Sequence, residues 1–199
     1  MNQADKVNID CSLDRGSFAK YVPEPKEELT VVSYNLDRNG YGEHNGQTGR
    51  LENIITILQK QLDSDSNNAP DIILLQELAN DCYNFGNYVN GIREIAYQLQ
   101  MHFAYVVEYI NYEQFSDGNT NHQCTIGNGI LSRYPIENIE SYRFKNQCCS
   151  LGSRLGGRVA LLADIKVSEE QSVRVNNVHL EAGTVEELHK GLYTRFKQS

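Results

Sequence analysis

The sequence predicts one α/β domain built around a parallel or mixed β-sheet with helices on one face. Two short apolar runs, residues 29–35 (LTVVSYN) and 71–77 (DIILLQE), have the length and β-branched content of buried strands. Between them, residues 51–62 place leucine and isoleucine at the spacing of an amphipathic helix. A strand, a helix and a strand with short joints indicate a βαβ unit and hence a parallel strand pair. The length of 199 residues suits a single domain or a large piece of one.

The remaining pattern continues the alternation, and loops are expected at 36–49, 80–91 and 111–126. Further elements are expected as a helix at 91–100, strands at 102–110 and 127–136, an edge strand at 136–145, a hairpin of 156–167 with 172–182, and a last helix at 185–198. Residues 1–28 are polar and carry Pro23 and Pro25, which favour an extended lead-in, so they are predicted to be a tail or linker.

Composition also bears on the compartment. The N-terminal residues lack the apolar core of a signal peptide, and no long uncharged apolar run could cross a membrane. The five cysteines are odd in number and irregularly spaced, which does not indicate a disulfide framework. Structural or free thiols in a reduced compartment, cytoplasmic or nuclear, are therefore expected.

The formal charge of −8 disfavours broad, non-specific nucleic-acid binding, which needs a basic surface. A net negative charge is nevertheless compatible with a small cleft in which a metal ion binds one phosphate. Solubility is the simpler explanation of the charge alone.

Polar side chains follow both predicted buried strands. Asn35 ends the first strand and Glu77 the second, and ligand sites in α/β sheets lie beyond the carboxyl ends of strands. Amide and carboxylate oxygens suit Mg²⁺ or Mn²⁺. A glutamate in this place is also common at a helix start or in solvent. His179 ends a third strand, where a histidine is usually a satisfied surface or core residue and less often catalytic.

Five motifs resemble, in order, those of the endonuclease/exonuclease/phosphatase superfamily, whose members are deoxyribonuclease-like. They are VVSYNLD, DIILLQE, GNGILSRYPI, GGRVALLADI and VNNVHLE, and the resemblance covers residues 29–198. It implies a deoxyribonuclease-like four-layer α-β-β-α sandwich. Residues 29–199 would be the N-terminal part of that domain, an incomplete first half with one mixed sheet and flanking helices.

The resemblance also implies roles for individual residues. Glu77 matches the principal metal ligand, with Asn35 and Asp37 beside it, and the cofactor would be Mg²⁺ or Mn²⁺. His179 matches the histidine that contacts the scissile phosphate, and Asn35 would share the catalytic role.

Two further residues are implied to bind substrate. Arg158 matches an arginine that begins a strand in many members. Asn128 lies in a motif near the cleft, and a structural role is the alternative for it.

The implied activity is a divalent-metal-dependent phosphoesterase in which water attacks phosphorus. The substrate class stays open among nucleic acid, phospholipid and small phosphate esters. The Gly-Asp-x-Asn and Ser-Asp-His motifs that complete the family's site do not occur in these 199 residues. Impaired activity is therefore expected, and a non-catalytic pseudo-enzyme or partner-binding fragment is the alternative.

A half-domain with one sheet would leave an apolar face without cover. That face is expected to include some of Val31, Ile73, Leu75, Leu161 and Val175. Because monomers rarely expose large apolar patches, self-association through this face is predicted.

Overall fold

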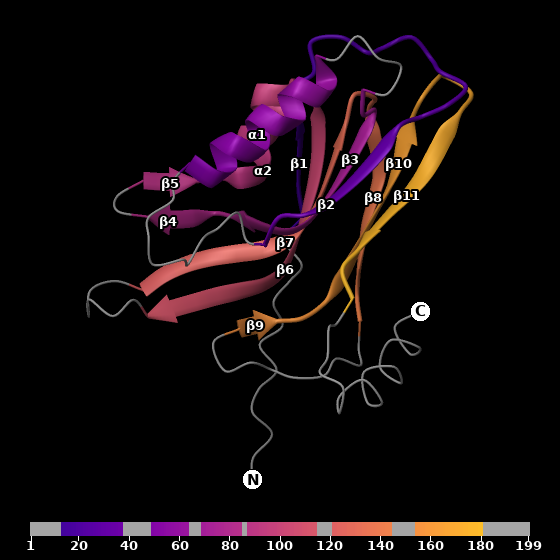
Figure 1. Cartoon of the computed structure of the whole chain (residues 1–199). Helices are drawn as coiled ribbons and strands as arrows, with labels where there is room; N and C mark the ends of the chain where they lie inside the picture. The colour runs from indigo at the N-terminus through magenta and orange to yellow at the C-terminus, as the bar shows by residue number, and fades with distance from the viewer. Residues whose placement is uncertain are drawn as a thin grey trace, which may run out of the picture.

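A computed structural model describes residues 13–37, 49–63, 69–84, 87–114, 121–144 and 154–180. The helices are α1 (Gly49–Leu62) and α2 (Gly91–Leu99). The strands are β1 (Leu13–Ser17), β2 (Val31–Asn35), β3 (Ile72–Asn80), β4 (Cys82–Asn84), β5 (Asn87–Val89), β6 (His102–Gln114), β7 (Asn121–Ser132), β8 (Ile136–Arg143), β9 (Arg154–Gly156), β10 (Val159–Lys166) and β11 (Ser172–Val178). These elements form three layers: the two helices, a larger sheet and a smaller sheet (Figure 1).

The larger sheet is mixed, as the sequence predicted. Its strand order is β1-β6-β7-β3-β2, with β9 paired to β6. β2 runs parallel to β3, which confirms the βαβ unit, and the other pairs are antiparallel. The parallel register places Asn35 beside Gln76, so the ends of β2 and β3 reach the same edge.

Both helices cover one face of this sheet. Ile55 and Leu58 of α1 and Ile92 and Ile95 of α2 pack with buried side chains of β3 and β6. Asn90 caps α2 by accepting a hydrogen bond from the backbone N–H of Arg93, which satisfies one of the free donors of the first turn.

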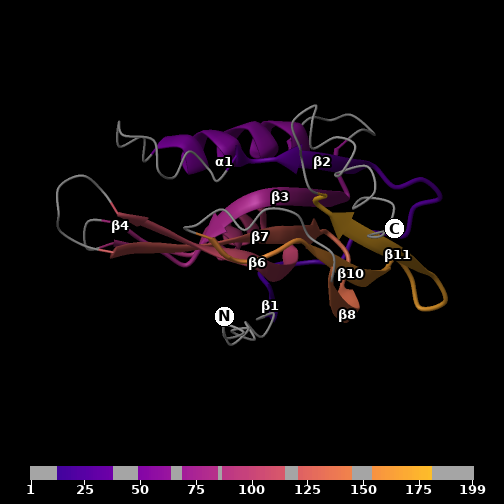
Figure 2. The ribbon, with the colours of Figure 1, turned by 90° about the horizontal axis from the view of Figure 1, so that it is seen from below.

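The opposite face is covered by a second sheet of β8, β10 and β11, all antiparallel. Seen from below, α1 lies at the upper left and this sheet at the lower right, with β3 and β7 between them (Figure 2). β10 follows a period of two, and its inward side chains meet those of the larger sheet. The residues on the two facing surfaces are Val159, Leu161, Ala163 and Ile165 of β10, with Ile72, Ala104, Val106 and Ile130 opposite.

This arrangement corrects the expectation of a bare face. The sequence pattern predicts one sheet, whereas the structure has two sheets that cover each other. Leu161 and Val175 are buried between the two sheets, and Ile73 and Leu75 are buried under the helices on the other face. Only Val31, on the edge strand β2, is exposed, at 51%. The basis for the predicted self-association is therefore lost.

Three segments differ from the sequence pattern. Within the predicted tail 1–28, Leu13–Ser17 form β1 and pair with β6. The range 80–91 contains the β4–β5 hairpin, and β6 and β7 extend as paired strands into 111–126. These polar strands are held by backbone hydrogen bonds and lack the apolar alternation that marks a strand in sequence. The predicted helix 185–198 lies outside the described residues.

The lead-in after β1 is anchored in the core. Asp71 is fully buried and accepts hydrogen bonds from Lys26 Nζ (2.9 Å) and the Thr30 backbone N–H (3.0 Å). Tyr134 Oη donates to the Glu24 carbonyl at 3.0 Å. Residues 24–30 are thus part of the folded domain.

Cys124 on β7 is disulfide-bonded, which differs from the expectation of reduced thiols. Disulfides form and persist mainly in oxidising environments. This cysteine therefore does not support the predicted cytoplasmic or nuclear location. In the part of the chain that the structure describes, no helix is long and apolar enough to span a membrane.

Two β-bulges converge on Gly127 of the central strand β7. On β3 the register shifts between Leu75 and Leu78, and Leu78 pairs with Gly127. On β6 it shifts between Val107 and Tyr109, and Val107 also pairs with Gly127. Bulges redirect side chains and are frequent beside active sites. Here they fall at Glu77 and Glu108.

Gly127→Ala is expected to destabilise the domain. A Cβ at this position would lie 2.0 Å from the Val106 carbonyl oxygen and 2.9 Å from the Tyr105 ring. Backbone must therefore move, at a cost of about 1–3 kcal/mol in unfolding free energy. Urea unfolding measures the loss. An alanine variant as stable as the wild type would show that the strands are further apart than described here.

Candidate active site

Glu77 occupies the bulge of β3 in an unusual backbone conformation. Its φ is 50°, in the left-handed region that non-glycine residues seldom adopt. Such conformations cluster at functional sites, where the surrounding structure holds them. The carboxylate is partly exposed, at 23%, and is accessible at the sheet edge.

Asn35, the last residue of β2, contacts this carboxylate. Its Nδ2 donates to Glu77 Oε1 at 3.2 Å. Its own Oδ1 accepts the backbone N–H of Asp37 at 2.9 Å, in a turn where Asp37 has a φ of 45°. The side chain of Asp37 is exposed.

His179 approaches Glu77 from the second sheet, one residue beyond β11. Its Nε2 lies 3.4 Å from Glu77 Oε1. Asn35, Glu77 and His179 therefore share one rim, as the sequence predicted. Their catalytic and metal-binding roles stay predictions.

The proton on His179 can be assigned from its other ring nitrogen. Arg158 Nη1 lies 2.7 Å from His179 Nδ1, and a guanidinium can only donate. Nδ1 is therefore the acceptor, and in the neutral ring the proton is on Nε2, on the side of Glu77.

Glu108 is a site residue that the sequence reasoning missed. It is fully buried on β6, forms an ion pair with Arg158, and places Oε2 3.6 Å from His179 Nδ1. Arg143 of β8 donates to the backbone carbonyls of Glu108 and Val107 and fixes this part of the strand. A glutamate inside the apolar run HFAYVVEYI was the available signal, because a buried carboxylate needs a partner.

The two residues predicted to bind substrate are both recessed. Arg158 stands behind His179, with 12% of its side chain exposed. Asn128 is fully buried, and its Nδ2 donates to the Val159 carbonyl of the facing sheet at 2.8 Å. This contact favours the structural alternative for Asn128 over the predicted contact with substrate.

The donor set at this rim fits Mg²⁺. Mg²⁺ prefers oxygen ligands and commonly keeps several waters beside one or two carboxylates and substrate phosphate. Glu77 supplies a partly exposed carboxylate. Asn35 directs its Nδ2 to that carboxylate, and its Oδ1, which accepts from the Asp37 N–H, keeps a second lone pair for an ion. Among the described residues no group of three or more His, Cys, Asp or Glu could hold a metal.

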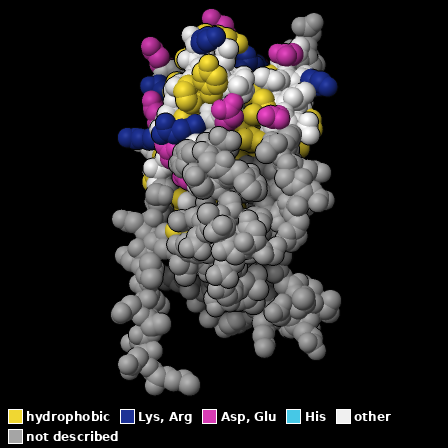
Figure 3. All heavy atoms as spheres, turned by 90° about the vertical axis from the view of Figure 1, so that its left-hand side faces the viewer, with side chains coloured by type: hydrophobic (Ala, Val, Ile, Leu, Met, Phe, Trp, Pro, Cys, Tyr) yellow, Lys and Arg dark blue, Asp and Glu magenta, His cyan; other side chains and the backbone are white. Residues whose placement is uncertain are grey.

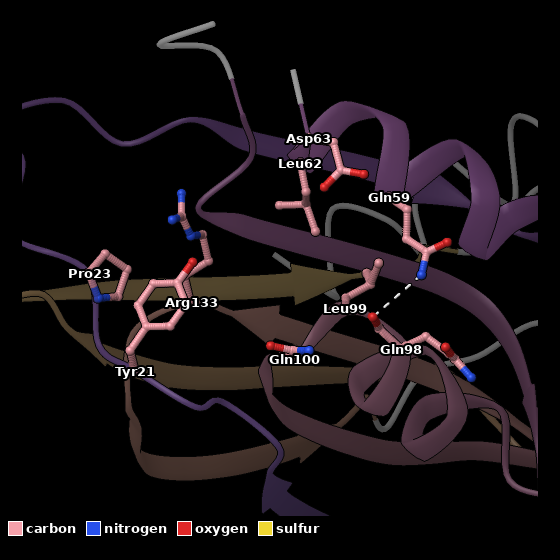
Figure 4. Close-up of a pocket in the computed structure, with 9 residues that line it drawn as sticks. All are labelled: Tyr21, Pro23, Gln59, Leu62, Asp63, Gln98, Leu99, Gln100 and Arg133. Carbon is pink, nitrogen blue, oxygen red and sulfur yellow. Dashed lines mark hydrogen bonds between the residues drawn. The ribbon is translucent and has the colours of Figure 1, made fainter. Parts of the chain in front are cut away.

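A pocket of about 270 Å³ lies elsewhere, at the last turns of α1 and α2 (Figure 4). Its wall is mainly polar and includes Gln59, whose Nε2 donates to the Gln98 carbonyl at 3.5 Å, and Arg133. None of the predicted site residues lines it. The pocket is therefore separate from the Glu77–His179 rim.

The surface seen from the left of Figure 1 mixes both signs of charge. In Figure 3 the described Lys and Arg side chains are interspersed with Asp and Glu and with small apolar patches. On that face no broad basic area of the kind that attracts nucleic acid is visible in the described part.

Solved structures that are similar to the chain include two endonuclease/exonuclease/phosphatase proteins. The first is the crystal structure of an endonuclease/exonuclease/phosphatase from Beutenbergia cavernae, with a TM-score of 0.58, 20% identity, and coverage of 85% of this chain and 43% of that one. The second is an endonuclease/exonuclease/phosphatase family protein from Leptotrichia buccalis, with a TM-score of 0.47, 16% identity, and coverage of 86% and 63%.

The chain thus spans less than two thirds of the length of either structure. No protein-family model and no curated protein matches the sequence. The agreement with the Beutenbergia cavernae structure is one of fold. The chain therefore has the deoxyribonuclease-like α/β fold of the endonuclease/exonuclease/phosphatase proteins, over part of its length.

Proposed function

We propose that this chain carries the metal-binding part of a phosphoesterase site. The observation that supports this most is the meeting of Asn35, Glu77 and His179, which come from three strands and two sheets. The fold, which is shared with an endonuclease/exonuclease/phosphatase, supports a phosphoesterase or nuclease in general. Metal dependence and the identity of the substrate are part of the proposal.

The proposed roles follow from the contacts. Glu77 and Asn35 would hold Mg²⁺ or Mn²⁺, which supplies positive charge against the charge that develops on the phosphate. His179 Nε2–H is oriented toward the same place and can donate to a phosphate oxygen. Arg158 donates to the ring from behind and is itself held by Glu108, so that the donor is fixed before substrate arrives.

Slow hydrolysis is part of the proposal. The two motifs whose residues orient the attacking water and complete the site in the resembled superfamily do not occur in these residues. The substrate is a phosphoester, and the described surface does not favour nucleic acid over a phospholipid or a small ester.

The test uses bis(p-nitrophenyl) phosphate, a small phosphodiester whose hydrolysis does not depend on recognition of a particular biological substrate. We expect nitrophenol release with Mg²⁺ or Mn²⁺ that exceeds the metal-only control, stops with EDTA and returns with excess metal. A panel of DNA, RNA, sphingomyelin and phosphoinositides then assigns the class. Metal binding without any hydrolysis would favour the non-catalytic alternative, and neither binding nor hydrolysis would contradict the proposal.

A further inference from the structure

A single buried amide from the second sheet lies against the bulge that carries Glu77. Asn177 of β11 is 1% exposed, and its Nδ2 donates to the carbonyls of Leu75 and Gly129, each at 2.8 Å. Leu75 and Gly129 are the last aligned pair of the β3–β7 ladder before the bulge. One amide group therefore joins both strands at the point where their register changes.

The other end of the same amide is also used at the bulge. Asn177 Oδ1 accepts from Gln76 Nε2 at 2.7 Å. Gln76 Nε2 lies 3.1 Å from Ser33 Oγ as well, which extends the contact to β2. The side chain before Glu77 is thus held on two sides, and its position limits how the backbone can turn at Glu77.

The strained residue follows directly. Glu77 has its φ of 50° one residue after Gln76, and a non-glycine residue keeps that conformation only where neighbours impose it. His179 stands two residues after Asn177 on the same strand end. Asn177 is therefore connected to both members of the pair Glu77 Oε1–His179 Nε2.

We propose that Asn177 is a positioning residue that imposes the left-handed conformation of Glu77 and sets it opposite His179. Its structural consequence is independent of the chemistry, whereas its effect on turnover rests on the function proposed above. Asn177 is buried behind the rim and would not touch the substrate. Its loss should lower kcat and metal affinity and leave the KM for a small phosphodiester nearly unchanged.

The experiment compares three variants of the whole chain. Asn177→Ala removes the amide, and Asn177→Asp keeps its size but turns an acceptor oxygen toward the two carbonyls. Tyr134→Phe is the matched control, because it removes one buried hydrogen bond, to the Glu24 carbonyl, far from the site. The first readout is the set of backbone NMR chemical shifts of Gln76 and Glu77, which report φ and need no metal.

We expect the Glu77 shifts to move from left-handed to extended values in both Asn177 variants and to stay in Tyr134→Phe. Metal affinity and kcat should fall roughly 10–100-fold in the Asn177 variants, as for residues that orient a metal ligand. Should Asn177→Ala fail to fold, Asn177→Asp gives the same comparison.

Two results would overturn the proposal. The first is that the Glu77 chemical shifts stay at left-handed values in both Asn177 variants. The second is that these shifts change while kcat and metal affinity in the Asn177 variants stay equal to those of Tyr134→Phe. If the shifts move and the wild type itself neither binds metal nor hydrolyses the ester, Asn177 still positions Glu77, and the proposed function is the part that fails.

Discussion

Glu77→Gln is expected to reduce metal-dependent phosphodiester hydrolysis roughly a thousandfold, the scale seen when one key electrostatic group is removed from a site. The substitution keeps the side-chain volume and an oxygen that can accept from Asn35 Nδ2. It removes the negative charge, and a neutral amide oxygen is a far weaker ligand for a hydrated divalent ion. Calorimetry with Mg²⁺ and Mn²⁺ should show the matching loss of binding.

The matched control is Glu140→Gln. Glu140 is 66% exposed on β8, where it pairs with Arg174 away from the rim. It makes the same chemical change without touching the site, so hydrolysis and metal binding should be unaffected. Equal metal affinity and equal rates in Glu77→Gln and Glu140→Gln would remove Glu77 from the site, provided that both variants melt like the wild type.

Glu108→Ala is expected to lower the free energy of unfolding by about 3–5 kcal/mol, the cost of leaving one half of a buried ion pair uncompensated. The Arg158 guanidinium, 12% exposed, would lose its carboxylate and remain largely out of water. Arg158, which donates to His179 Nδ1, would no longer be held in place, so hydrolysis should fall as well. Guanidinium chloride unfolding gives the stability, and the nitrophenyl assay gives the rate.

An exposed pair supplies the comparison. Asp14 and Arg93 also form an ion pair, at 2.8 Å, but the arginine is 52% exposed. Asp14→Ala should therefore cost only about 0–1 kcal/mol. If Glu108→Ala costs no more than Asp14→Ala, the carboxylate is not buried with a charge partner as described.

Removing both partners separates stability from chemistry. The double variant Glu108→Leu with Arg158→Met removes both charges of this pair, and such replacements are often neutral or stabilising. We expect it to recover most of the stability lost in Glu108→Ala and none of the hydrolysis, because His179 Nδ1 then lacks the hydrogen bond from Arg158.

The sequence by itself determined the local elements and three of the residues at the rim. Apolar runs and helical spacing predicted β2, α1, β3 and their parallel pairing, because these signals depend on which faces are buried and need no knowledge of distant contacts. Polar residues after those runs identified Asn35 and Glu77, and the motif order added His179. The distances then bring these residues together as expected.

Only the tertiary structure decided how the faces are covered and what holds the site. The packing of β8, β10 and β11 on the larger sheet buries Leu161 and Val175, and strand order in a sheet is not encoded in local periodicity. The bulges at Glu77 and Glu108 arise from a register shift between neighbouring strands, which a single strand's sequence does not reveal.

The supporting residues were hidden for the same reason. Glu108 reads in sequence as one charge within a strand, and Asn177 as one of two adjacent asparagines. Their importance lies in partners 50 to 102 positions away: Arg158 and His179 for Glu108, Leu75 and Gln76 for Asn177. A buried polar group must find its hydrogen-bond partners wherever the fold places them. The sequence therefore determines which side chains can form the site, whereas the contact of the two sheets decides which of them hold it in place.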